Sequence, residues 1–106
     1  PLGPAIVDRA DLPDPAAARL ETYVNGELRQ QGSPADLIFD IPTLIHVLSQ
    51  GLTLEPGDII ATGTPDGVGM GFDPPRFLED GDVVEIRMEP IGSLKNTFRA
   101  VRGVAR

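Results

Sequence analysis

The chain has 106 residues, of which 41% are hydrophobic and 24% charged, so it is the size of one domain with a single core and is too apolar to stay disordered. Its formal net charge of −7 excludes a general affinity for nucleic acid or anionic membranes, which requires clustered Lys and Arg. The absence of cysteine excludes disulfides and thiolate sites and fits a cytoplasmic protein, and no apolar run approaches the roughly 20 residues of a membrane helix.

The first segment is divided by prolines at positions 1, 4, 13 and 15, which rule out a continuous helix. We predict a short strand through Leu2, Ile6 and Val7, followed by a loop. Because the chain opens on Pro1 and not on Met, we expect it to be the interior of a longer protein.

A β-hairpin is predicted over about residues 19 to 31. Two strand-like runs flank Asn25-Gly26, the pair that best tolerates the positive φ angles of a two-residue hairpin turn. With 12 glycines and 11 prolines in the chain, short strands joined by turns are favoured over long helices.

One short helix is predicted near residues 41–50. Its apolar residues recur at the i, i+3, i+4, i+7 spacing of one helical face. Asp40 can cap its first turn, and Gly51 lies where helices commonly end. The apolar positions are Ile41, Leu44, Ile45 and Leu48.

After the helix the chain is predicted to form strands. "LEPGDII" (54–60) and "LEDGDVV" (78–84) are near copies, each a Gly-containing turn that leads Asp and a β-branched pair into a strand. A further strand pair is expected around a turn at 90–92. The basic side chains at the end are interpreted as the solvated face of the last strand; they are Lys95, Arg99, Arg102 and Arg106.

The glycine-rich segment "ATGTPDGVGMG" (61–71) lies between the two copies and is the candidate binding loop. It does not fit nucleotide binding, because Pro74-Pro75 prevents the helix that would hold a pyrophosphate and no Gly-Lys-Ser/Thr is present. Small residues at a strand end let a ligand approach the backbone, and the hydroxyls of Thr62 and Thr64 can orient a keto acid or carboxylate. A glycine-rich connection that binds nothing is the alternative.

The other polar residues of interest have structural interpretations. His46, the sole histidine, lies off the apolar helical stripe and is predicted to be on the surface. No tight metal-ligand spacing and no Ser-His-Asp or Cys-His set is present, so caps and turns explain the carboxylates better. These are Asp36, Asp40, Asp66 and Asp73.

Three stretches together resemble the C-terminal half of the catalytic domain in the fumarylacetoacetate hydrolase family. They are "PLGP", "VNGELRQQGSPADLIFDIPTLIHVLSQGLTLEPGDIIATGTPDGVG" and "PPRFLEDGDVVEIRMEPIGSLKNTF", in order over nearly the whole chain. The resemblance implies that residues 1–106 are the C-terminal portion of such a domain, with a mainly β (α+β) fold of the mixed, barrel-like β-roll type, and a homodimer.

The resemblance also implies an activity. Family members use Mg²⁺ or Mn²⁺ to act on small 2-keto or 1,3-diketo acids, by hydrolysis of a C–C bond as in acylpyruvate cleavage, by decarboxylation or by keto-enol isomerisation, often in aromatic catabolism. The metal polarises the keto-enol oxygens as a Lewis acid. The expected partner is therefore a small 2-keto acid, with no nucleic acid and no membrane.

The resemblance places the catalytic and metal-binding residues outside this chain. The Glu-x-Glu pair and Asp that hold the metal are expected upstream of residue 1, and the chain contains no Glu-x-Glu. Lys95 lies in the final strand, away from the family's catalytic lysine. Only a substrate-binding segment carries over: Thr64, with Gly63 and Thr62 beside it. The alternative function is a noncatalytic β domain that serves dimerisation or structural support.

Overall fold

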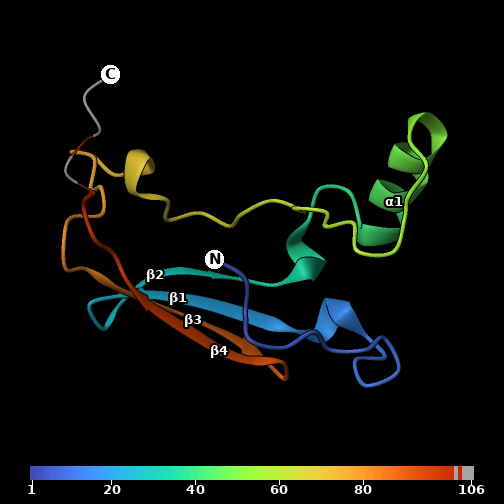
Figure 1. Ribbon diagram of the computed structural model, residues 1–106, viewed down its shortest axis with the longest axis horizontal. Coiled ribbons are helices and arrows are strands. Elements are labelled where there is room, and N and C mark those ends of the chain that lie inside the picture. Colours follow the sequence, from blue (N-terminus) through green and yellow to red (C-terminus); the bar gives the residue numbers. More distant parts are fainter. Residues whose placement is uncertain (102, 104–106) are drawn as a thin grey trace.

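The computed structural model describes residues 1–101 and 103. Within them the chain forms one four-stranded antiparallel sheet of order β2-β1-β3-β4 and one α-helix (Figure 1). The mainly β class with a single short helix is confirmed, and the sheet is open, not closed into a barrel. The elements are β1 (Arg19–Val24), β2 (Glu27–Gly32), α1 (Ile41–Gly51), β3 (Val83–Glu89) and β4 (Gly92–Thr97), with short 3-10 turns at Pro15–Ala17, Pro34–Asp36 and Gly69–Gly71.

The hairpin predicted over 19–31 is confirmed as β1 and β2. Asn25 has φ 51° and Gly26 has φ 81°, the two left-handed positions that a turn of this length requires. Asn25 also accepts a hydrogen bond through Oδ1 from the Val83 amide at 2.9 Å and donates from Nδ2 to Asp82 at 2.8 Å. The turn is therefore tied to the start of β3, which pairs with β1.

Helix α1 begins where the sequence predicts. The carboxylate of Asp40 accepts a hydrogen bond from the Thr43 amide at 2.9 Å, and Pro42 is accommodated in the first turn. Hydrogen bonding from the Thr43 side chain, and then from its amide, lowers the pKa of Asp40 because it favours the charged carboxylate. Among the described residues, no helix is long or apolar enough to cross a bilayer.

The two near copies form the same turn, but only one of them leads into a strand. Asp58 accepts a side-chain bond from the Glu55 amide and Asp82 from the Glu79 amide, both at 2.8 Å. The second copy continues into β3. The predicted strand at Ile59-Ile60 is wrong: these residues lie in an irregular segment, no described strand pairs with them, and Ile59 is 71% exposed.

The predicted strand through Leu2, Ile6 and Val7 is also wrong. This segment has no strand partner in the part of the chain that the structure describes, and Ile6 is fully exposed. β-Branched residues favour an extended backbone, but a strand also needs a ladder of hydrogen bonds with a neighbour. Of the basic tail, Lys95 lies exposed on β4 and Arg99 just beyond it, whereas Arg102 and Arg106 lie outside the described residues.

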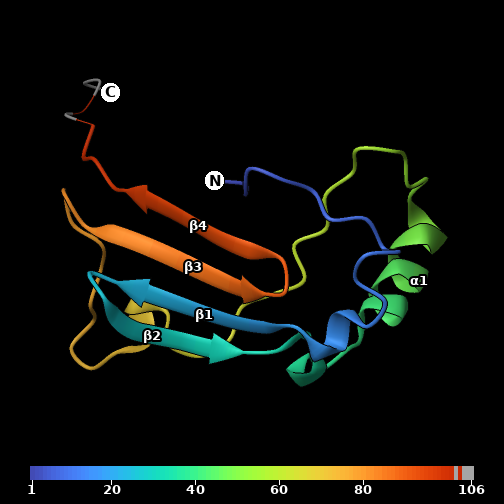
Figure 2. The same ribbon diagram turned by 90° about the horizontal axis from the view of Figure 1, so that it is seen from below.

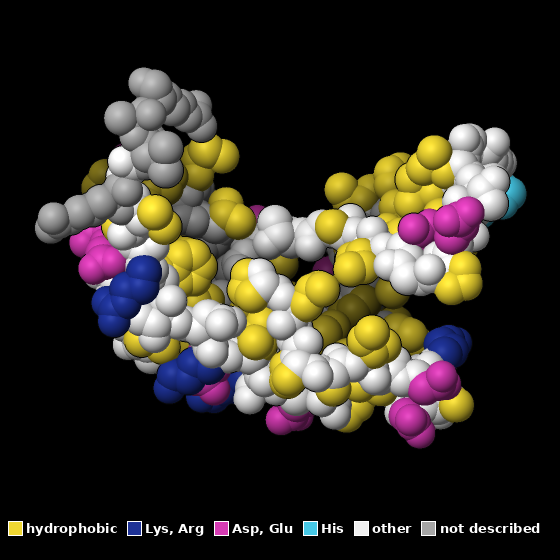
Figure 3. Space-filling view, viewed as in Figure 1, with side chains coloured by type: hydrophobic (Ala, Val, Ile, Leu, Met, Phe, Trp, Pro, Cys, Tyr) yellow, Lys and Arg dark blue, Asp and Glu magenta, His cyan; other side chains and the backbone are white. Residues whose placement is uncertain are grey.

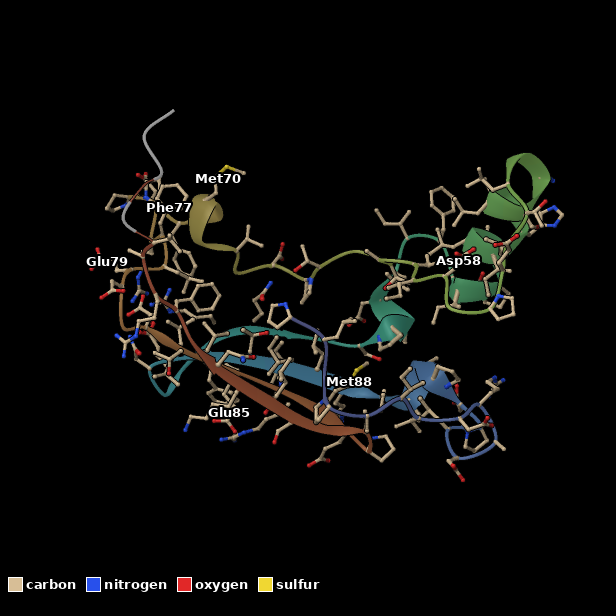
Figure 4. All side chains as sticks on the ribbon, viewed as in Figure 1. Asp58, Met70, Phe77, Glu79, Glu85 and Met88 are labelled. Carbon is tan, nitrogen blue, oxygen red and sulfur yellow. The ribbon has the colours of Figure 1, made fainter. Side chains whose placement is uncertain are left out.

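The sheet has one apolar and one polar face. Strand alternation and the register place Thr22 opposite Ile86 and Val24 opposite Val84 on the apolar face, with Met88 further along. Glu85 lies on the other face (Figure 4), where Arg87 stacks over the Tyr23 ring. The glycine-rich loop crosses over the apolar face on its way from α1 to β3, as the two ribbon views show (Figures 1 and 2).

The apolar face is only partly covered, so the chain has a very small core. Ala18, which is fully buried, and Val24 are the buried hydrophobic residues among those described, and no large side chain there is completely buried. The accessible surface is 8657 Å², whereas a compact protein of this mass exposes about 5,700 Å². The single core that the chain length allows is therefore small within the described residues. Figure 3 shows hydrophobic side chains lining a hollow between two arms of the molecule.

Candidate functional site

The Thr62-Gly63-Thr64 segment lies in the irregular segment between α1 and β3, beside the end of β2. It forms one side of an open cleft of about 620 Å³ whose opposite side comes from the segment before α1 and from Leu44. All three residues are exposed. The structure thus places the sequence-predicted binding residues together, on an accessible wall. The remaining lining residues are Gln31, Asp36, Leu37, Ile38, Phe39, Pro65 and Asp66.

Thr64 is held in place by Gln30, a residue that the sequence analysis did not identify. The Gln30 side-chain amide donates one hydrogen bond to Thr64 Oγ1 at 2.8 Å and another to the Pro65 carbonyl at 3.0 Å. Gln30 lies on β2, 34 residues away in the chain. The only sequence signal was its place in the "VNGELRQQG" hairpin, and no local pattern indicates so distant a partner.

The backbone beside Thr64 is also suited to a ligand. Gly63 has φ +126°, and a Cβ added there would meet no atom within 4 Å. No hydrogen bond within the described residues uses the amides of Thr62, Gly63 or Thr64. Exposed, unused amides next to a hydroxyl are a common way to bind a carboxylate.

The sequence model described as "Fumarylacetoacetate (FAA) hydrolase C-terminal" matches residues 1–99. The chain belongs to the fumarylacetoacetate hydrolase family. The match runs from the N-terminal segment through β4 and therefore includes the Thr-Gly-Thr segment and Gln30.

Three proteins similar to this chain are named for three different activities. Oxaloacetate tautomerase YisK of Bacillus subtilis is 57% identical over 91% of the chain and 32% of its own length. Maleylpyruvate hydrolase from Sphingobium sp. SYK-6, solved with manganese(II) and pyruvate, is 41% identical with a TM-score of 0.80 over 90% of this chain and 33% of that one. A 5-carboxymethyl-2-hydroxymuconate delta-isomerase from Mycobacterium smegmatis is 46% identical with a TM-score of 0.69 over 79% of this chain and 31% of that one.

The chain spans about a third of the length of the curated relatives that it matches. The neighbouring hydrolase and isomerase structures show that the same backbone occurs in family members with different reactions. The specific reaction of this chain must therefore be argued from more than its fold.

The rest of the glycine loop has a structural role. A Cβ at Gly67 would overlap the backbone carbonyl of Arg29, and one at Gly69 would overlap the carbonyl of Arg76. These glycines let the loop pack directly against β2 and against its own returning segment. Close backbone packing thus accounts for the glycines at positions 67 and 69.

The end of the loop is held against β2 by an ion pair and by cation–π contacts. Arg76 pairs with both carboxylate oxygens of Glu27, at 2.9 and 3.0 Å, and this bond lowers the pKa of Glu27. The Arg76 and Arg29 guanidinium groups both approach the Phe72 ring, at 5.2 and 5.5 Å from its centroid. Arg29 Nε lies 3.2 Å from Glu27 but is not aligned for a hydrogen bond. In Figure 4, Met70 and Phe77 mark this end of the loop, far from α1.

The carboxylates proposed as caps behave as predicted in two cases. Asp36 accepts a hydrogen bond from the Ser33 amide at 2.8 Å, and Asp40 caps α1. His46 is exposed, as predicted, and its Nε2 lies 2.9 Å from the Gln50 side-chain amide. Asp66 and Asp73 are exposed loop residues, and Asp66 borders the cleft.

The described residues do not themselves fit a divalent metal. Mg²⁺ and Mn²⁺ prefer several oxygen ligands around one point. No group of three or more His, Cys, Asp or Glu side chains comes together in the part of the chain that the structure describes.

Proposed function

We propose that this chain is the C-terminal portion of a catalytic domain in a fumarylacetoacetate hydrolase family enzyme, and that its Thr62-Gly63-Thr64 segment binds the carboxylate of a small 2-keto or 1,3-diketo acid. The enzyme hydrolyses a C–C bond, isomerises or decarboxylates this acid. It acts in the cytoplasm as a homodimer, with Mg²⁺ or Mn²⁺ bound by residues outside 1–106. The relatives named as a hydrolase, an isomerase and a tautomerase support this range.

The position of Thr64 is the observation that carries the proposal. Its hydroxyl is exposed at the side of an open cleft, next to amides that no described residue uses. Gln30 donates to the hydroxyl oxygen, and the hydroxyl's own hydrogen makes only a long contact of 3.4 Å with the Pro65 carbonyl within the described residues, so a ligand can replace that contact. A carboxylate, which only accepts hydrogen bonds, is the complementary group.

The charges around the cleft support the metal part of the proposal. Asp36 and Asp66 both line the cleft, and the chain has a net charge of −7. An anionic substrate placed beside two carboxylates is disfavoured unless a cation offsets them. The relative solved with manganese(II) and pyruvate holds such a pair, a divalent cation together with a 2-keto acid.

The test compares Thr64→Val with Thr53→Val in the intact protein. Thr53 is exposed just after α1 and does not line the cleft, so it is a matched control. We expect Thr64→Val to lose about 1–3 kcal/mol of binding or transition-state stabilisation, a roughly 5- to 150-fold effect, without a change in the unfolding temperature. Pyruvate binding in the presence of Mn²⁺, measured by calorimetry, and the KM and kcat of oxaloacetate tautomerisation provide the readouts.

A loss in Thr64→Val and none in Thr53→Val supports the carboxylate subsite. Equal binding and equal kinetics in the two variants would contradict the proposal. If the intact wild-type protein bound neither Mn²⁺ nor pyruvate, the result would favour a noncatalytic β domain.

A further inference from the structure

The hydrogen bonds of Gln30 influence whether the Thr64 hydroxyl donates or accepts a hydrogen bond toward a ligand. The Pro65 carbonyl can only accept a hydrogen bond, so the group of Gln30 that faces it at 3.0 Å must be the amide nitrogen. The same nitrogen is 2.8 Å from Thr64 Oγ1. The orientation of the side-chain amide is thus determined by chemistry, and both of its hydrogens are used.

This arrangement makes the Thr64 hydroxyl a donor toward the cleft. Its oxygen already accepts from Gln30, and its own hydrogen has one possible acceptor among the described residues, the Pro65 carbonyl at 3.4 Å. That distance is long for an O–H···O bond. A ligand oxygen in the cleft is a better acceptor. A threonine hydroxyl can donate one hydrogen bond and accept two, and because Gln30 fills one of the two acceptor positions, donation is favoured on the cleft side.

The position of Gln30 is itself well fixed. It lies on β2, which pairs with β1 through the hairpin, and the neighbouring Arg29 carbonyl packs against Gly67. Gly32, at the end of the same strand, leaves only 3.0 Å between its would-be Cβ and Pro65. Strand β2 therefore fixes the position of residues 64–67 through two contacts, one between Gly32 and Pro65 and one between Arg29 and Gly67.

We propose that Gln30 is a positioning residue that favours donation by the Thr64 hydroxyl toward the cleft, and that the subsite thereby prefers a carboxylate, which only accepts hydrogen bonds, over a carboxamide, whose amino group would face the donors of Thr64 and the neighbouring amides. This inference rests on the proposed function, because it assigns the specificity of the same subsite. Gln30 acts through Thr64 and does not need to touch the substrate.

A double-mutant cycle tests the inference in the intact protein with Mn²⁺. Gln30→Met removes both donated bonds while keeping side-chain length, Thr64→Val removes the hydroxyl, and the third variant combines them. We expect each single variant to weaken pyruvate binding roughly tenfold and to weaken pyruvamide binding much less. Because Gln30 acts through the hydroxyl, the double variant should bind pyruvate as weakly as Thr64→Val alone.

Two additional variants distinguish a lost hydrogen bond of Gln30 from a folding defect. Gln50→Met, at the exposed end of α1, is the matched control and should bind pyruvate like the wild type. Gln30→Asn keeps the amide but is one methylene shorter, so it cannot reach both Thr64 and Pro65, and it should also lose selectivity for pyruvate over pyruvamide. Unfolding temperatures are measured for every variant.

The outcomes separate this inference from the proposed function. If Thr64→Val weakens pyruvate binding but Gln30→Met and Gln30→Asn do not, the role of Gln30 is wrong and the subsite stands. Additive losses in the double variant, or equal losses for pyruvate and pyruvamide, would show a general packing role and overturn the inference. No loss in Thr64→Val would remove the subsite and, with it, the role of Gln30.

Discussion

The α-carbon of Gly67 faces the backbone carbonyl of Arg29 so closely that no side chain fits between them. The loop that carries the proposed carboxylate subsite therefore packs backbone to backbone on the outer strand of the sheet. Its glycine at this position also has φ +99°, which other residues adopt only with strain. Contact and conformation both require glycine here.

Gly67→Ala should consequently destabilise the intact protein by more than about 2 kcal/mol, because it adds backbone strain and an overlap with Arg29. Thermal or denaturant unfolding measures this loss. Gly51→Ala, at the end of α1 where a Cβ meets nothing within 4 Å, is the control and should be neutral or slightly stabilising. Equal stability of the two variants would show that the loop does not pack on β2 in this way.

The hairpin turn gives a second prediction. Asn25 combines a left-handed φ of 51° with side-chain bonds to Asp82 and to the Val83 amide. Asn25→Ala loses both bonds and is strained at this φ, so we expect it to cost about 1–3 kcal/mol of unfolding free energy. Asn25→Gly relieves the strain and should recover part of this loss. If Asn25→Gly were no more stable than Asn25→Ala, backbone strain would not contribute to the loss of unfolding free energy.

The carboxylate of Asp82 links the stability of the sheet to pH. Hydrogen bonds from the Glu79 amide and from Asn25 lower its pKa in the folded chain. In acid the unfolded chain thus binds more protons than the folded one, so stability increases with pH between the folded pKa and the usual value near 4, and levels off above it. The stabilisation is lost as the pH falls through the folded pKa.

Asp82→Asn should reduce this acid-side slope, since its side chain does not titrate. The measurement is the unfolding temperature of wild type and variant between about pH 2 and pH 6. We expect the two curves to converge toward low pH and to separate above about pH 4. Parallel curves over the whole range would show that Asp82 does not contribute to the pH dependence.

Local sequence patterns predicted the elements whose causes are local. Asn25-Gly26 determines a hairpin through its own backbone preferences, and Asp40 starts α1 through a bond to Thr43, three residues away. The repeated turns at Glu55 and Glu79 were predictable for the same reason, because each is closed by a hydrogen bond between residues three positions apart.

Features that depend on distant neighbours were not predictable in this way. Ile59-Ile60 has the composition of a strand, but pairing depends on a partner, and no described strand lies beside it. Gln30 contacts Thr64 only because β2 and the loop run side by side in space. The candidate site was thus proposed from its threonines, its glycine and the family resemblance, whereas the contact between Gln30 and Thr64 required the structure.

The last prediction concerns the wall of the cleft opposite Thr64. Phe39 and Leu44, which line it, flank the N-terminal cap of α1, where Asp40 binds the Thr43 amide at 2.9 Å. Asp40→Ala removes this cap and should fray the first turn, so that the wall becomes mobile and pyruvate binding weakens modestly, by roughly two- to fivefold. Asp40→Asn retains a good capping residue and should bind pyruvate nearly as well as the wild type.

Hydrogen exchange and calorimetry on the intact protein check this expectation together. Amides in the first turn of α1 should exchange faster in Asp40→Ala than in Asp40→Asn, while those of β1 and β3 stay unchanged, because the helix makes few contacts with the sheet. Faster exchange without weaker pyruvate binding would show that Phe39 and Leu44 do not form the opposite side of the substrate cleft. Weaker binding in both variants would instead assign a direct role to the Asp40 charge.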